Sequence, residues 1–255
     1  MYPRPSGIVT LTTDFGQRDP YVGIVKGAVL RASPKVQVVD VTHGAPPQDV
    51  ASGAFLLWSL IGRFPSGTVH IGVVDPGVGT DRRLLAVAAC DAYWLVPDNG
   101  MIGAVLARDD AHEVRVVDVE HLRLQPASAT FHGRDVLAPA AAWLAAGRYG
   151  FSAMGPRVTD ADALDLVFGG DRRVVHVDHY GNLVSNVEAE AIGAATAVQA
   201  GDWRADIHRT YGDVAEGERL AYIGAFGLLE IARRNGSAAD ETGLQVGSTI
   251  ELLGP

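Results

Sequence analysis

Short apolar, β-branched runs alternate with longer helix-like segments through the first half of the chain. GIVTLTT and TVHIGVVD have the length and composition of buried strands, and RLLAVAAC and AYWLVP predict two more. YVGIVKGAVLRASP, between the first two runs, is typical of a helix. Strands that alternate with helices predict a mainly parallel α/β sheet, whose ligands bind where the carboxyl ends of strands meet their loops.

Acidic residues stand where three of the helices are expected to begin. Asp19-Pro20 has the pattern of an N-cap followed by proline at the first helical position. Asp49 is expected to cap the second helix in the same way. Asp135 is expected to cap the last helix of this half, in which Pro139 comes early enough to be tolerated.

The pattern changes near residue 170. RRVVHVDHYGNLVSNV has strand patterning around a Tyr-Gly-Asn turn, and the segments after it are short, β-like and separated by glycines. The sequence therefore predicts an N-terminal α/β domain over residues 1–165 and a smaller all-β domain over residues 172–255, joined by a linker.

Composition excludes several classes of protein. With 255 residues, 47% of them hydrophobic, the chain can bury a sizeable core. A net charge of -9 and only two lysines argue against nucleic-acid binding through a basic face. The single cysteine, Cys90, excludes an internal disulfide and a cysteine-rich zinc site. MYPRPSG has no signal pattern and no apolar run is long enough to span a bilayer, so a cytoplasmic protein without a membrane partner is expected.

Polar residues gather in the loop TTDFGQRDPY after the first strand. The loop lacks both the G-x-G-x-x-G pattern of dinucleotide-binding folds and the glycine-lysine pair of a P-loop. The carboxylate of Asp14 suits the two vicinal hydroxyls of a ribose, but it equally suits the amides of its own turn. Pattern alone leaves both interpretations open.

Two further loops carry candidate chemistry. VVDPGVGTDRR sets Asp75 on one side of a run of small residues and Arg82 and Arg83 on the other, although Asp-Pro-Gly taken alone is ordinary turn chemistry. His132 stands in TFHGRD, where a lone loop histidine is more often a surface residue than a catalyst. VPDNG is interpreted as a structural turn.

Other chemistries find no support in the pattern. A serine hydrolase of the G-x-S-x-G type is excluded because that elbow is absent. Asp14, Asp75 and His132 are conceivable metal ligands, but no close-spaced ligand pair supports them, so neither a metal nor a cofactor is expected. These three residues meet only if the sheet brings their loops together.

Six motifs in the same order together resemble one family, and they run almost from end to end of the chain. The chain resembles the S-adenosyl-L-methionine (SAM) hydrolases, also called SAM hydroxide adenosyltransferases, which are related to the fluorinase and chlorinase. The motifs are TTDFGQRDPYVGIVKG, VVDPGVGTDRR, VPDNG, TFHGRDVLAP, HYGNLVSN and FGLLEIARRNGSAA.

The resemblance implies an N-terminal α/β domain, a C-terminal β-barrel-like domain and a homotrimer, with SAM bound between the N-domain of one subunit and the C-domain of a neighbour. It implies hydrolysis of SAM to adenosine and L-methionine by in-line attack of an activated water on the ribose 5′ carbon. Its catalytic trio falls on Asp75, Arg82 and His132. Asp75 then accepts a proton from the water, directly or through His132, and Arg82 orients Asp75 and favours its charged form.

Binding roles also follow from the resemblance. Asp14 matches the acceptor of the ribose hydroxyls, Asp19 and Tyr21 match positions at the methionine end, and Asp178 falls near the acid that meets the amino group. Asn182 matches the asparagine that recognises adenine. The full substrate-binding set is Asp14, Asp19, Tyr21, Phe131, Gly133, Asp178, Asn182, Phe226, Arg233 and Asn235.

Three positions depart from the family pattern. Ala225 replaces a frequent serine or asparagine, at a position that the family pattern associates with the methionine carboxylate. Phe226 stands where the halogenases carry an arginine, and Gln48 where the fluorinase has a tryptophan over the ribose.

Three alternative functions remain: halide attack on SAM, a non-catalytic SAM or adenosine sensor, and a metal-dependent hydrolase. The halogenating relatives place an aromatic residue where Asp75 stands. A carboxylate there would repel a halide by about 4 kcal/mol at contact in a partly screened site, which favours water as the nucleophile.

Overall fold

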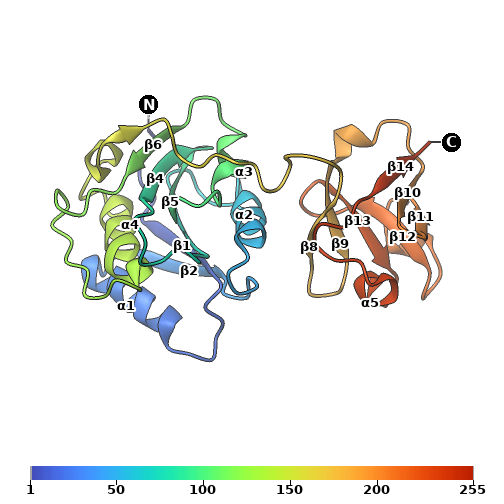
Figure 1. The fold of residues 1–255 in the computed structure, drawn as a ribbon, viewed down its shortest axis with the longest axis horizontal. Coiled ribbons are helices and arrows are strands. Elements are labelled where there is room, and N and C mark those ends of the chain that lie inside the picture. Colours follow the sequence, from blue (N-terminus) through green and yellow to red (C-terminus); the bar gives the residue numbers. More distant parts are fainter. Residues whose placement is uncertain (1, 255) are drawn as a thin grey trace. The chain divides into compact units, whose positions relative to one another are not determined.

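The computed structural model describes residues 2–254 and divides into two compact units, Met1–Leu166 and Val167–Pro255 (Figure 1). The first unit is a sheet with helices on its faces, and the second is built from antiparallel sheets. The predicted fold class, a mainly parallel α/β domain followed by a smaller all-β domain, is confirmed.

The sheet of the first unit has the strand order β2-β1-β3-β5-β4-β6-β7. Strand β1 pairs in parallel with β2 and β3, and β3 pairs in parallel with β5. Strand β4 is antiparallel to both β5 and β6, so β6 points the same way as β5. The strands are β1 (Ile8–Thr13), β2 (Gln37–Thr42), β3 (Val69–Val73), β4 (Leu84–Ala89), β5 (Ala92–Pro97), β6 (Glu113–Val116) and β7 (Arg157–Val158).

Helices cover both faces of this sheet (Figure 1). One apolar core lies between the sheet and the helices α1 and α4, and a second lies between the sheet and α2 and α3. Strand β3 is buried along its whole length between these layers. The helices are α1 (Tyr21–Ala32), α2 (Val50–Trp58), α3 (Gly103–Leu106) and α4 (Ala138–Ala145), with η1 (Gly133–Leu137) and η2 (Phe151–Met154) as short helical turns.

Strands β4 and β5 form an antiparallel hairpin, which strict alternation of strands and helices did not predict. Cys90 and Asp91 make its two-residue turn with φ of 51° and 58°. Two left-handed residues in a row are the backbone of a type I′ turn, whose twist suits a hairpin. The usual sequence signal for that turn is Asn-Gly or Asp-Gly, and Cys-Asp lacks it.

Of the three predicted helix caps, one is confirmed and two are wrong. The Asp49 carboxylate accepts a hydrogen bond from the Ser52 amide at 3.0 Å and caps α2. Pro20, and not Asp19, occupies the N-cap of α1. Asp135 lies inside the π-helical turn η1, and its carboxylate accepts from the Ala127 and Ser128 amides at 3.0 Å. It therefore fastens the loop before the helix and does not cap the helix.

The second unit holds a three-stranded sheet, β11-β10-β14, and a four-stranded sheet, β12-β13-β9-β8. Isolated bridges between Ile207 and Ala221 and between Arg173 and Thr249 join the two sheets at both edges, so the unit closes in a barrel-like manner around one apolar core. Its strands are β8 (Val174–Val177), β9 (Leu183–Glu188), β10 (Ala197–Ala200), β11 (Trp203–Asp206), β12 (Arg219–Ile223), β13 (Leu228–Arg233) and β14 (Glu251–Leu253). Its helical elements are η3 (Ala189–Ile192), η4 (Tyr211–Asp213) and α5 (Ala238–Thr242).

Candidate active site

Asp14 and Asp75 follow two neighbouring parallel strands. Asp14 comes directly after β1, and Asp75 comes two residues after the end of β3. The Asp14 amide donates to the Val73 carbonyl at 3.4 Å, which ties the two strand ends together. Both carboxylates therefore stand at the carboxyl edge of the sheet, where α/β folds bind their ligands.

Asp75 and Arg82 form a buried ion pair across the six residues that separate them in the loop. Nε of Arg82 donates to both carboxylate oxygens of Asp75 at 2.7 and 2.8 Å, and Nη2 donates to Oδ2. The Asp75 and Arg82 side chains are only 7% and 8% exposed. Charge-assisted bonds of this bidentate kind fix direction as well as distance.

The small residues between Asp75 and Arg82 allow this closure. The Thr80 amide and hydroxyl bond to the Gly77 carbonyl at 3.2 and 2.7 Å, which makes a tight turn. Gly79 has a φ of +85°, a conformation that glycine adopts without strain. The loop thus folds back on itself and brings its acid and its base together.

His132 is the third member of this group. It precedes η1, and its Nδ1 lies 3.2 Å from Nη2 of Arg82. Because a guanidinium can only donate, Nδ1 must be the acceptor, so the neutral ring carries its proton on Nε2. Burial and then the positive charge of Arg82 lower the pKa of His132, against the opposing charges of Asp75 and Asp135. The imidazole is therefore neutral near pH 7.

Arg82 has one further donor in the site. Among residues 2–254, no hydrogen-bond partner lies within range of its buried Nη1. An unpaired buried donor costs about 1–3 kcal/mol, more for a charged group, and such groups are usually satisfied by water or by a ligand. The chemistry of Nη1 therefore suits an oxygen atom bound beside Asp75.

A cleft of about 80 Å³ brings several of the predicted residues together. Its lining includes Asp14, Asp75, His132 and the predicted neighbours Phe131 and Gly133. Phe15, Val73, Val78 and Thr130 complete the lining and were not predicted. Phe15 and Thr130 lie beside predicted residues within their motifs, and this adjacency was the available signal.

The Asp14 carboxylate is held by the backbone of a distant loop. Its Oδ2 accepts from the Gln48 amide at 2.8 Å, and Gln48 has a φ of 65°. The contact uses the main chain of Gln48, so it does not depend on the side chain that replaces tryptophan there. The amide that Asp14 satisfies therefore belongs to a distant loop and not to its own turn, and Asp14 also lines the cleft.

Three aromatic rings pack edge to face beside the cleft. The Phe131 ring lies 5.9 Å from that of Phe15 and 5.6 Å from that of Tyr21. Tyr21 is 48% exposed, so its ring offers surface to a ligand. Asp19 is exposed and does not line the cleft, although it lies two residues from Tyr21.

Arg83, the second arginine of the loop VVDPGVGTDRR, has structural partners. Nε of Arg83 donates to Asp98 at 2.7 Å and Nη1 to Asp160 at 2.7 Å. Asp98 also accepts from the Asp162 amide at 2.8 Å. Arg83 therefore fastens the VPDNG turn to the chain around residue 160, which agrees with a structural role for that turn.

In the second unit, Asp178 and Asn182 belong to one turn. Oδ1 of Asp178 accepts from the Tyr180 and Asn182 amides at 2.9 and 2.8 Å, and Oδ2 accepts from Nδ2 of Asn182 at 2.8 Å. Asn182 is only 4% exposed. A Cβ on Gly181 would meet Oγ of Ser237 at 2.0 Å, so the turn packs closely on the segment that follows Asn235.

The other predicted residues of this unit have hydrogen-bond partners or positions of their own. Nε of Arg233 donates to the Gly217 carbonyl at 2.9 Å, and Nδ2 of Asn235 donates to Glu216 at 3.1 Å. Phe226 is 37% exposed on the turn between β12 and β13.

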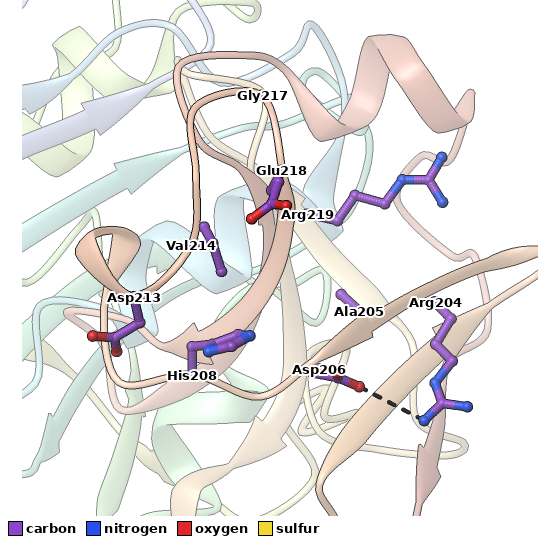
Figure 2. A pocket seen from close by; sticks show the side chains of 9 residues that line it. All are labelled: Arg204, Ala205, Asp206, His208, Asp213, Val214, Gly217, Glu218 and Arg219. Atoms are coloured by element: carbon purple, nitrogen blue, oxygen red, sulfur yellow. Dashed lines mark ion pairs between the residues drawn. The ribbon is translucent and has the colours of Figure 1, made fainter.

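A larger cleft of about 640 Å³ lies in the second unit, and none of the predicted residues line it (Figure 2). Its walls are polar and carry both charges, including an Arg204–Asp206 pair at 3.6 Å with side chains 62% and 67% exposed. Exposed pairs of this kind attract ligands weakly because solvent screens them. The smaller cleft, with its buried charges, is the better candidate for chemistry.

Two absences hold for residues 2–254. No three His, Cys, Asp or Glu side chains are grouped as a metal ion would require. In the same part of the chain, no helix is long and apolar enough to cross a bilayer.

The fold and the cleft define a two-domain α/β protein with a charged site at the carboxyl ends of parallel strands. The SAM hydroxide adenosyltransferase N-terminal domain matches residues 9–155, and the C-terminal domain of the same family matches residues 172–251. The chain belongs to the SAM hydroxide adenosyltransferase family.

Named relatives agree with this assignment. The (R)-S-adenosyl-L-methionine hydrolase of Thermus thermophilus is 38% identical, over 96% of this chain and 99% of that protein. A fluorinase of Actinopolyspora mzabensis is 27% identical, over 98% of both chains. The crystal structure of an uncharacterized conserved protein from Thermotoga maritima matches with a TM-score of 0.89 and 31% identity, over 96% of this chain and 99% of that chain.

Proposed function

We propose that the protein hydrolyses S-adenosyl-L-methionine to adenosine and L-methionine. The family and its named hydrolases support this activity. The observation that carries it is the buried Asp75–Arg82 pair beside His132, because these groups can hold and activate one water. The substrate is a sulfonium, so methionine leaves as a neutral thioether and needs no acid to protonate it.

In this mechanism Asp75 accepts a proton from the attacking water. Arg82 orients the carboxylate through Nε and Nη2, and its remaining donor, Nη1, holds the water oxygen. Holding a nucleophile in line with the carbon–sulfur bond can recover several of the ~7–11 kcal/mol available from proximity. Proton transfer to a placed base adds roughly 10²–10⁴-fold.

His132 acts as a donor in this proposal. Because Nδ1 accepts from Arg82, the neutral ring presents N–H at Nε2 and has no second lone pair for a proton relay. Of the two routes open from the sequence, direct proton transfer to Asp75 is therefore favoured. The Nε2 proton orients the water or the ribose oxygen next to it.

Halide attack is disfavoured on electrostatic grounds. A halide in the cleft would lie beside the Asp75 carboxylate, which is 7% exposed and so poorly screened by solvent. The fluorinase match, at 27% identity, is also weaker than that to the hydrolases.

The substrate-binding roles rest on the same family pattern. The cleft in the first unit measures about 80 Å³, whereas drug-sized ligands occupy roughly 300–1,000 Å³. It can take the reacting carbon and part of the ribose, so most of SAM needs other walls. We propose a homotrimer in which the Asp178 and Asn182 turn of a neighbouring subunit supplies them. A single cysteine is compatible with a reducing compartment, and a cytoplasmic location is proposed on that ground.

The test is turnover. Purified protein is incubated separately with each sulfonium epimer of SAM, and adenosine and methionine are quantified by chromatography. We expect both products in equal amounts, with the (R) epimer preferred as in the names of the relatives. Binding without adenosine above the spontaneous background would instead establish a sensor. Activity lost to a strong chelator and restored by a divalent ion would establish a metal-dependent hydrolase.

A further inference from the structure

A carboxyl group is buried in the second unit outside the predicted set of site residues. Glu230 lies on β13 and is only 5% exposed. It is directly opposite Tyr222 on β12 and Val184 on β9. Burying a carboxyl is costly unless it is hydrogen-bonded or neutral, so its partners carry information about its role.

Glu230 ends a chain of hydroxyl groups. The Tyr222 hydroxyl donates to Oε2 of Glu230 at 2.5 Å, and the Tyr211 hydroxyl lies 2.9 Å from that of Tyr222. Burial raises the pKa of Glu230, the Tyr222 hydrogen bond opposes the rise, and the negative charge of Asp178 adds to it. The titratable groups that act on Glu230 are therefore Tyr222 from β12 and Asp178 from the turn after β8, with Tyr211 behind Tyr222.

Glu230 also packs on the turn that carries Phe226. A Cβ on Gly224 would lie 1.8 Å from Oε1 of Glu230, so the backbone there is in direct contact with the carboxyl. The Gly224 amide donates to the Leu228 carbonyl at 2.9 Å and the Gly227 amide to the Gly224 carbonyl at 3.0 Å. The Glu230 carboxyl therefore packs directly against the backbone of the 224–227 turn and limits the positions that this backbone can take.

The same carboxyl faces the turn that holds Asp178. Asn182 comes directly before β9 and two residues before Val184, the residue opposite Glu230. Nδ2 of Asn182 donates to Asp178, whose charge acts on Glu230. Glu230 is thus placed between the 178–182 turn and the 224–227 turn.

We propose that Glu230 is a positioning residue that couples the 178–182 turn to the 224–227 turn and so sets the shape of this unit's contribution to the SAM site. The inference rests on the proposed function, because it gives a role to turns that carry predicted substrate contacts. It assigns Glu230 no contact with the reacting atoms. Its loss should therefore weaken SAM binding and leave the chemical step nearly intact.

The first test separates positioning from stability. In the double variant Tyr222→Phe/Glu230→Leu both polar partners become apolar, and only the half-buried Tyr211 hydroxyl, which solvent can reach, loses a hydrogen bond, so the fold should keep most of its stability. We expect the KM for SAM to rise at least about tenfold while kcat stays within about threefold. Glu251→Leu, an exposed change on β14, is the matched control with wild-type kinetics. A stable double variant with wild-type KM would overturn the proposal.

The second test needs only a conservative change. Gln at position 230 keeps the acceptor for Tyr222 but cannot ionise. As pH rises through the raised pKa of Glu230, the carboxyl ionises near the Asp178 charge, so KM of the wild type should rise, and KM of Glu230→Gln should stay within about threefold of its low-pH value. Parallel pH profiles would overturn the coupling. Wild-type protein that makes no adenosine would instead refute the proposed function itself, and the two failures are thus distinguishable.

Discussion

Nη2 of Arg82 lies 3.2 Å from Nδ1 of His132 and also donates to Oδ2 of Asp75. One guanidinium therefore fixes both the direction of the carboxylate and the tautomer of the imidazole. The three groups act as a unit in which Arg82 is the common partner.

The tautomer of His132 predicts unequal effects of two amide substitutions. The side-chain nitrogen of glutamine can take the place of Nε2, and that of asparagine the place of Nδ1, where it would face the Arg82 donor. We expect His132→Gln to retain roughly tenfold more kcat/KM than His132→Asn. The measurement is adenosine formation at limiting SAM. Equal losses would contradict the assigned tautomer.

His132 also sets the sign of one pH effect. Protonation of His132 puts an N–H at Nδ1, where it faces the Nη2 donor of Arg82 and removes the acceptor of that hydrogen bond. The neutral imidazole is therefore the active form. Because its pKa lies below the usual value, kcat/KM should fall only at a pH lower than that at which an ordinary histidine becomes protonated. His132→Gln should lose this acid limb.

Asp75→Asn should slow the chemical step far more than it weakens binding. The amide keeps the shape of the carboxylate but is a much weaker proton acceptor, so we expect kcat to fall by roughly 10²–10⁴-fold. The dissociation constant for SAM should change by less than about threefold, because Asp75 serves the water. Single-turnover decay of SAM and calorimetric binding measure the two quantities. If Asp75→Asn hydrolyses SAM at the wild-type rate, Asp75 does not activate the water and is only a turn residue.

Arg82→Leu should destabilise the fold. It leaves the Asp75 carboxylate buried, 7% exposed, without its partner, at a cost of about 3–5 kcal/mol in the free energy of unfolding. Lys26→Leu, which breaks a half-exposed pair with Asp40, is the control and should cost less than about 1 kcal/mol. Denaturant unfolding checks both. Asp75→Asn/Arg82→Leu should recover part of the loss, since no charge remains buried.

The buried His70 should make the free energy of unfolding fall at acid pH. Its ring lies 4.3 Å from that of Trp94 and its Nδ1 2.8 Å from the Thr10 hydroxyl, and burial lowers its pKa to about 3. In the unfolded chain His70 becomes protonated as the pH falls below about 6.5, whereas in the folded chain it stays neutral until about pH 3. This contribution to stability is complete above pH 6.5 and falls by up to about 1.4 kcal/mol per pH unit toward pH 3.

Urea unfolding between pH 4 and pH 7 checks this dependence. His70→Phe should flatten the slope of stability against pH by about one proton. Trp94→Phe disturbs the same packing but keeps the imidazole, so it should lower stability without changing the slope. Equal slopes for wild type and His70→Phe would contradict the prediction.

The proposed intersubunit site predicts complementation. Asp14→Ala and Asn182→Ala should each be inactive alone, because each removes one half of every site. Co-expressed mixed trimers contain some sites built from two intact halves, so activity should return in particles of three times the 26.9 kDa chain mass. Sedimentation gives the mass and adenosine formation the activity. Mixed trimers without activity would count against a shared site.

Much of this fold was predictable because its strands are long and apolar. The order of motifs placed Asp14 and Asp75 after separate strands, and an α/β sheet requires such loops to meet at one edge. Both strands of the β4–β5 hairpin were predicted, but the tight turn between them was not, since Cys90–Asp91 lacks the usual glycine signal.

Other features depend on distant contacts that no local pattern encodes. The Asp14 carboxylate accepts a hydrogen bond from the main-chain amide of Gln48. The side chain at position 48 gives no sign of this main-chain contact. Asp135 resembles a helix cap but binds the Ala127 and Ser128 amides instead. Glu230 interrupts an apolar run, and only the pairing of β13 with β12 shows that Tyr222 faces it.

The hydrogen bond between the Asp14 amide and the Val73 carbonyl fixes the distance between the ends of β1 and β3. Neighbouring strands lie about 4.8 Å apart, and this spacing belongs to the backbone and not to either loop. In the proposed reaction, Asp14 after β1 holds the sugar hydroxyls and Asp75 after β3 holds the attacking oxygen. The strand spacing therefore sets the distance between the bound ribose and the attacking water. An extra methylene between sugar and sulfonium would shift the electrophilic carbon by about 1.5 Å, and no loop rearrangement moves the strands to follow it.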